Sequence, residues 1–179
     1  MYQDESTDSL ILRTRQLAEG GQLAQALQLC QERAAQEPQE VSVWNLLAEL
    51  QAESGQRQEA LVSFYRAAQL LFEKGASDRA IAAYKAALDT NPHDVEANLC
   101  LAALYRQQGQ VSRAALAYEM AAQSLATRGW IHASLTVVRM IIDMSPDNVA
   151  RRMRLADQYA RADLVPEAVH ELEAAAAYL

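Results

Sequence analysis

The chain has 179 residues, a formal net charge of −7, and a composition that is 51% hydrophobic but only 6% aromatic. Acidic residues outnumber basic ones in both halves, so repulsion from phosphate excludes general nucleic-acid binding. The first nine residues are polar and acidic, and no apolar run approaches 18 residues, so we predict neither a signal peptide nor membrane insertion. A cytoplasmic protein is the default expectation. Much of the hydrophobic content is alanine, which favours helices. This composition fits many close contacts between helices better than one large hydrophobic core.

Apolar residues recur at three- and four-residue spacing almost throughout, which is typical of amphipathic helices. No segment alternates as a strand would. Glycine and proline mark the joints between the periodic segments. We therefore predict ten helices, over residues 7–19, 22–36, 41–54, 57–74, 77–90, 95–108, 111–128, 131–144, 149–162 and 165–178.

The joints carry residues whose conformational preferences end and start helices. Gly55 and Gly109 stand where a helix must end and reverse, since glycine accepts the left-handed conformation. Asp94 and Asn148 follow prolines by two residues and are good N-caps. Ser77 is a further candidate N-cap.

The sequence repeats with a step of 54 residues. This step relates Pro38, Pro92 and Pro146, and it also relates Gly21 to Gly75 and Gly129. A regular period over the whole chain predicts an array of similar units, each packed on its neighbours. Because no linker interrupts it, we predict one continuous domain over residues 1–179.

The repeated residues resemble the tetratricopeptide repeat, a 34-residue helix–turn–helix with a loose signature of large and small positions. The stretch from Val41 matches at Trp44, Leu47, Ala48, Ala60, Phe64 and Ala67. The stretch from Val95 matches at Leu101, Ala102, Tyr105, Ala114, Tyr118 and Ala121. The stretch from Val149 matches at Leu155, Ala156, Tyr159, Ala168, Leu172 and Ala175. The resemblance implies an all-α fold, a right-handed α-α superhelix of about ten antiparallel helices.

The step of 54 departs from the family's 34 by 20 residues, about one helix and its turn. The helix at 57–74 fits both as the second helix of one repeat and as the first helix of the next. The helix at 111–128 does the same. We therefore predict that each is an unbroken helix shared by two overlapping repeats, an arrangement that resembles bacterial adaptors with long bridging helices.

In the family, first helices line a concave groove that binds another protein, and the register carries that role onto particular residues here. Trp44 falls at a packing position, and we expect Trp130 to lie in the core as well. The resemblance implies that partner-binding residues come from the first helices and the shared long helix: Asn45, Glu49, Glu53, Tyr65, Gln69, Phe72, Leu99, Ala103, Arg106, Met153 and Asp157. The lysine-rich clamp of one branch of the family is not expected, because Lys74 and Lys85 are the only lysines and neither falls on the groove.

Catalytic chemistry has little support in the sequence. His93, His132 and His170 are scattered without metal-ligand spacing, and no nucleotide-binding, metalloprotease or nucleophile-elbow motif is present. The two cysteines, Cys30 and Cys100, cannot form a disulfide framework, and Cys30 falls at a core position. We predict no catalytic residue, no metal site and no cofactor.

Two groups of charged residues at the C-terminal end are expected to be solvated. Arg151, Arg154 and Arg161 fall roughly on one side of a helix, with a docking patch for an acidic partner as the alternative. Glu167, Glu171 and Glu173 on the last helix are likewise read as a solvated face.

These observations predict a non-catalytic adaptor that binds another protein, either a folded regulator such as a small GTPase or a peptide. Bacterial adaptors of this kind serve signalling, motility or secretion, which is the setting that the resemblance implies. The last helix ends in an apolar run, Ala174 to Leu179, where a repeat array normally has a polar cap. Self-association through this helix, or packing on further repeats of a longer protein, is therefore the alternative function.

Overall fold

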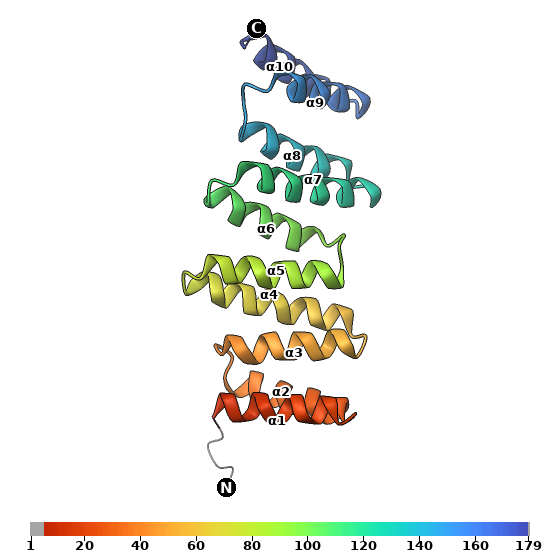
Figure 1. Cartoon of the computed structure of the whole chain (residues 1–179). Coiled ribbons are helices and arrows are strands. Elements are labelled where there is room, and N and C mark those ends of the chain that lie inside the picture. Colours follow the sequence, from red (N-terminus) through yellow and green to blue (C-terminus); the bar gives the residue numbers. More distant parts are fainter. Residues whose placement is uncertain (1–5, 179) are drawn as a thin grey trace. The chain divides into compact units, whose positions relative to one another are not determined.

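The computed structural model describes residues 6–178, and these form an all-α fold (Figure 1). Every predicted helix is present, with both ends within two residues of the expected positions. The helices are α1 (Thr7–Glu19), α2 (Leu23–Gln36), α3 (Val41–Glu53), α4 (Arg57–Glu73), α5 (Ser77–Thr90), α6 (Val95–Gln107), α7 (Val111–Thr127), α8 (Ile131–Asp143), α9 (Val149–Arg161) and α10 (Val165–Ala176).

The helices group into two compact units. The first runs to Pro92 and holds α1–α5, and the second starts at His93 and holds α6–α10. Each unit is built from the same three-helix element, in which a long helix lies between two shorter ones. That the whole chain acts as one continuous domain stays a prediction.

In the first unit α4 packs against α3 on one side and α5 on the other (Figure 1). Alanines allow this close approach on both sides, since Ala60, Ala67 and Ala68 are fully buried along α4. The Ser63 hydroxyl donates to Oε1 of Gln51 on α3 at 2.6 Å, which satisfies both buried polar groups. α4 is continuous, so the predicted shared helix is confirmed.

A second core in the same unit joins α2 and α3, and α1 packs on both helices. It contains Leu27, Cys30, Leu46 and Leu50, with Trp44 half-buried against it. The core position predicted for Cys30 is therefore confirmed. The indole Nε1 of Trp44 donates to the carbonyl of Pro38 at 3.1 Å, so this large side chain ties the α2–α3 turn to the core.

In the second unit α7 repeats the role of α4, as an uninterrupted helix between α6 and α8. Tyr118 is the largest fully buried side chain of this helix, and the Ser134 hydroxyl of α8 donates to the carbonyl of Ala122 at 2.8 Å. α9 and α10 form a further antiparallel pair that contacts α8. The prediction of a second shared helix is confirmed.

Trp130, which we expected in the core, is 59% exposed. It is the N-cap residue of α8 and directly follows the left-handed Gly129, so its side chain stands at the turn, ahead of the face that packs on α7. The helix carries Leu135 and Ile142 into the core instead. The expected core role of Trp130 was therefore wrong.

The turns that follow α3, α6 and α9 share one geometry. Gly55 and Gly109 have φ of 80° and 72°, and Asp163, at the same position of the repeat, has φ of 61°. In each turn a backbone N–H one residue further on donates back to the helix, as Gln110 does to the carbonyl of Tyr105 at 2.8 Å. This pattern is the Schellman closure, which needs a left-handed residue at the turn.

The helix starts largely follow the predicted caps. The carboxylate of Asp94 accepts from the N–H of Ala97 at 2.9 Å, and the side chain of Asn148 accepts from that of Arg151 at 3.1 Å. Ser77 was wrongly predicted as a cap, because α5 begins at Ser77 itself and its N-cap is Ala76, which has no side-chain acceptor.

No helix among residues 6–178 is both long enough and apolar enough to cross a membrane.

The left-handed turns give a direct stability test. We expect Gly109→Ala to lower the free energy of unfolding by about 1–2 kcal/mol, because a Cβ is unfavourable at positive φ. The added methyl would meet no atom within 4 Å, so the loss is conformational and not steric. Urea denaturation measures it. Asp163→Gly, where a side chain already occupies this conformation, is the matched control and should not destabilise. An unchanged stability of Gly109→Ala would contradict this account of the turn.

Candidate functional site

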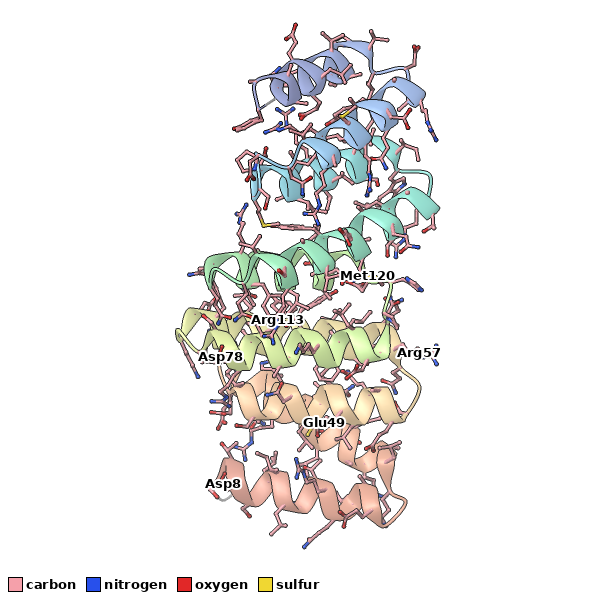
Figure 2. All side chains as sticks on the ribbon, turned by 45° about the horizontal axis from the view of Figure 1, so that its top comes forward. Asp8, Glu49, Arg57, Asp78, Arg113 and Met120 are labelled. Carbon is pink, nitrogen blue, oxygen red and sulfur yellow. The ribbon has the colours of Figure 1, made fainter. Side chains whose placement is uncertain are left out.

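Asn45, Glu49 and Glu53 form a polar stripe along α3. Their four-residue spacing places them on one side of the helix, and Figure 2 shows Glu49 midway along it. Glu49 and Glu53 are exposed and Asn45 is half-buried. The opposite side of α3 enters the core through Val43, Leu47 and Leu50, so the stripe is the part of this helix that is open to a partner.

One hollow lies beside this stripe, between α3 and α5, with α4 beneath it. It has a volume of about 240 Å³ and is lined by Asn45, Glu49, Phe64, Leu71, Arg79, Ala82, Ala83 and Ala86. Phe64 and Leu71 of α4 supply an apolar floor. A carboxylate on α3 and a guanidinium on α5 stand at its walls. The hollow can therefore receive an apolar group that carries hydrogen-bonding groups on both sides.

A second hollow lies on the other side of Glu49, between α1 and α3. Its volume is about 390 Å³, and it is lined by Arg15, Ala18, Glu19, Leu46, Glu49, Leu50 and Glu53. Arg15 reaches the carboxylate of Glu49 at 3.8 Å, and both side chains are more than half exposed, so this ion pair contributes little to stability. Because Glu49 lines both hollows, they adjoin and form one surface over α1, α3 and α5, which we call the α3 groove.

Tyr65, Gln69 and Phe72 lie on another part of the first unit and line neither hollow. Tyr65 and Phe72 each follow a floor residue by one position, so they lie roughly 100° around α4 from the groove. The Tyr65 ring is tilted against that of Tyr84 on α5, with centroids 6.0 Å apart. The structure does not bring these three residues to the α3 stripe, and their role in binding stays a prediction.

In the second unit the stripe at the same repeat position has different chemistry. Leu99 and Ala103 of α6 stand where the first unit has Asn45 and Glu49. Leu99 is half-buried, whereas Ala103 and Arg106 are exposed. The face of α6 is therefore more apolar than that of α3. A partner that needs the amide and carboxylate would recognise the first unit.

Met153 and Asp157 lie on α9, four residues apart, and both are exposed. The carboxylate of Asp157 pairs with Arg161 on the same helix at 2.8 Å. Arg154 and Arg161 are exposed, as predicted for a solvated face, whereas Arg151 is half-buried and lies 3.9 Å from the carboxylate of Glu119 on α7. Any contact of Met153 and Asp157 with a partner stays a prediction.

A buried ion cluster near the C-terminal end was missed by the sequence reasoning, which placed Glu171 on a solvated face. Glu171 of α10 is only 1% exposed, and its carboxylate accepts from Arg152 of α9 at 2.8 Å. Arg139 of α8 approaches the same carboxylate at 3.7 Å. Arg152 also donates from Nε to the carbonyl of Pro146 at 2.8 Å. The cluster links three helices, so it orients α10.

The 54-residue step of the sequence could have indicated that Glu171 is buried. Glu171 stands 54 residues after Ala117 and 108 after Ser63, both of which are buried. A charged residue at a repeatedly buried position needs a buried partner, and Arg152 is within reach on the preceding helix.

Burial shifts the pKa values of two side chains, Tyr159 and Cys30. Burial raises the pKa of Tyr159 above its usual value, and nearby Arg139 opposes part of this effect. Burial also raises the pKa of the Cys30 thiol to about 11. A thiol with such a pKa is protonated at neutral pH and unreactive.

The residues that would carry catalysis or hold a metal are dispersed. His93, His132 and His170 are all exposed and lie far apart along the second unit's sequence. Across residues 6–178 no three His, Cys, Asp or Glu side chains gather closely enough to hold a metal ion.

Comparisons with known proteins agree with this helical architecture. The family model described as Tetratricopeptide repeat matches residues 65–129, from the middle of α4 to the turn after α7. No curated protein matches the sequence.

Several solved structures are similar over most of the chain. A crystal structure of MamA has 17% identity, covers 99% of this chain and 96% of its own, and has a TM-score of 0.34. MamA from Desulfovibrio magneticus RS-1 has 16% identity, coverages of 99% and 97%, and a TM-score of 0.32. YrrB, described as a TPR protein with an unusual peptide-binding site, has 14% identity, coverages of 96% and 85%, and a TM-score of 0.33.

The buried cluster predicts a marked stability effect. We expect Arg152→Met to lower the free energy of unfolding by about 3–5 kcal/mol, because it leaves the buried carboxylate of Glu171 without its nearest partner. Urea denaturation measures the loss. Arg161→Met, which breaks only the exposed pair with Asp157, is the matched control and should cost less than about 1 kcal/mol. The double variant Arg152→Met/Glu171→Leu should be more stable than Arg152→Met alone, and the opposite order would contradict the proposed cost of an unpaired charge.

The two cysteines should differ in reactivity. At pH 7 we expect a thiol reagent to modify Cys100, which is half-buried, well before Cys30, which is fully buried with a raised pKa. Peptide mass spectrometry after timed labelling measures the two rates. In urea the rates should converge. Equal rates in the native protein would show that Cys30 is accessible.

Proposed function

We propose that this chain is a tetratricopeptide repeat protein and that it is a non-catalytic scaffold that recruits a partner protein through the α3 groove. The observation that carries the proposal is the pair of adjoining hollows that share Glu49. Together they place an apolar floor, carboxylates, an amide and guanidinium groups on one surface. Protein–protein interfaces combine apolar and polar groups in this way.

The dimensions of the groove favour a broad contact over the capture of one side chain. Its lining comes from α1, α3, α4 and α5, and each hollow is partly open to solvent. We therefore favour a folded regulator, such as a small GTPase, as the partner, with an extended peptide as the alternative. The groove residues that we assign to contact are Asn45, Glu49 and Glu53, joined by Arg15 and Arg79.

The charges of the groove define the complementary surface. Three carboxylates, Glu19, Glu49 and Glu53, line the α1–α3 hollow with one guanidinium, that of Arg15. Arg79 stands alone among the charged residues on the α5 wall. A partner should therefore place basic groups toward α1 and α3 and an apolar group over Phe64 and Leu71.

We also propose a cytoplasmic, bacterial setting in signalling or motility. This part of the proposal rests on the resemblance of the long shared helices to bacterial adaptors. The non-catalytic role rests on the resemblance to tetratricopeptide repeat scaffolds.

Charge reversal in the groove tests the proposal. We expect Glu49→Lys to abolish capture of the partner from the source cell, because Glu49 lines both hollows. Affinity capture with quantitative mass spectrometry compares the variant with the wild type. Glu73→Lys is the matched control, since it makes the same change in charge at an exposed site at the end of α4, and its partner list should be unchanged.

A second variant separates the groove from the α4 surface. Tyr65→Ala/Phe72→Ala should retain the partner if binding is confined to the α3 groove. Loss of the partner from this variant, with retention by Glu49→Lys, would move the binding site to the outer face of α4 and overturn the proposal as stated.

A further inference from the structure

The α3–α5 hollow is lined by small side chains at positions where the repeat elsewhere carries larger ones. By the 54-residue step, three alanines of α5 correspond to larger residues of α8: Ala82, Ala83 and Ala86 correspond to Thr136, Val137 and Met140. α5 packs on α4 as α8 packs on α7, so the fold accepts a side chain as large as methionine at this place. The hollow is therefore a property of the α5 sequence and not a requirement of the fold.

The rim of this hollow also differs between the two units. Three polar residues stand around it in the first unit where the second unit has apolar ones: Asn45, Glu49 and Arg79 against Leu99, Ala103 and Ala133. Polar groups around an apolar space fix the orientation of a side chain that enters it. The first unit thus combines an open apolar space with groups that can position an occupant.

The floor residue Phe64 occupies the large position of the repeat. It is 6% exposed, and its counterpart Tyr118 is 1% exposed, so the floor is equally well packed in both units. The third counterpart, Leu172, is 49% exposed, because no helix follows α10 within residues 6–178, and its expected packing role was wrong. Leu179, which ends the predicted apolar run, lies outside the described residues.

The adjoining α1–α3 hollow already holds a cation that belongs to this chain. The guanidinium of Arg15 lies 3.8 Å from the carboxylate of Glu49, and both side chains are exposed. Because three carboxylates and this one guanidinium line the hollow, it keeps a net negative charge. An exposed ion pair is weak, so a basic side chain from outside can take the place of Arg15 at Glu49.

We propose that the α3 groove recognises two neighbouring side chains of its partner. A methionine or leucine enters the α3–α5 hollow, where it takes the place that Met140 has in the second unit. An arginine or lysine enters the α1–α3 hollow and replaces Arg15 as the counter-ion of Glu49. Arg15 is then an internal competitor, which favours partners that bring a cation next to the apolar side chain. This inference rests on the proposed function, because it names the chemistry that the same groove selects.

A peptide library provides the probe. Random dodecapeptides displayed on phage are selected on the full chain, and those that also bind the Ala86→Met variant are removed. We expect the remaining peptides to share a methionine or leucine and an arginine or lysine at a constant spacing. Recovery of no peptide, or of peptides without a basic residue, would overturn the inference.

The most enriched peptide is then labelled, and its affinity is measured by fluorescence anisotropy. Ala86→Met should weaken binding at least about tenfold, because the methionine fills the hollow. Ala126→Met, at an exposed alanine of α7 outside both hollows, is the matched control and should bind as the wild type does. Glu49→Gln should weaken binding about two- to fivefold, and this exposed position gives a reading even if Ala86→Met does not fold.

The competitor role of Arg15 has its own test. Arg15→Gln should tighten binding of the same peptide about two- to fivefold, because Glu49 is then free for the basic residue of the peptide. A peptide in which that residue is glutamine should show no such gain. Weaker binding to Arg15→Gln would overturn the inference, since Arg15 would then attract the partner.

The two proposals about the groove fail in different ways. If the peptides do not behave as expected but Glu49→Lys still loses the partner from the source cell, this inference is wrong and the proposed function stands. If Glu49→Lys keeps the partner, the proposed function itself is wrong.

Discussion

Burial of one helix on two sides is the constraint on which the rest of this structure depends. α4 and α7 each pack against the helix before and the helix after, and this leaves little room for large side chains. Fully buried alanines along both helices, such as Ala60 and Ala67 on α4 and Ala114 and Ala121 on α7, permit the approach. Since small side chains leave little apolar area per contact, stability comes from many such contacts in series.

The same constraint builds the groove. When α4 is enclosed between α3 and α5, its residues Phe64 and Leu71 form a floor and the two neighbouring helices form walls. Polar residues can stand on those walls because the core requires only the opposite side of α3. The groove is thus a consequence of helix sharing. Its chemistry, set by Asn45, Glu49 and Arg79, is free to differ from that of the second unit, where Leu99 and Ala103 take the equivalent positions.

At the contact between α9 and α10, a buried ion pair takes the place of the small side chains that line the earlier helix contacts. Glu171 occupies a position that holds Ser63 and Ala117 in the earlier long helices, and it remains buried because Arg152 and Arg139 neutralise it. Replacing a small side chain with a carboxylate makes this joint dependent on exact partners. It also joins α10 to α8 and α9.

The sequence by itself determined the number, the bounds and the sharing of the helices. Periodic apolar residues, the left-handed glycines and the caps at Asp94 and Asn148 are local signals, and the step of 54 identified α4 and α7 as shared. Only the tertiary structure decided which side chains those helices bury. Trp130 is exposed because it lies in the turn before α8, ahead of the residues of α8 that pack on α7. Glu171 is buried because Arg152 reaches it from α9. Tyr65 and Phe72 lie away from Glu49 because they point from α4 in a different direction from Phe64 and Leu71. The burial of Glu171 depends on neighbouring helices, and spacing along one helix cannot specify what its neighbour provides.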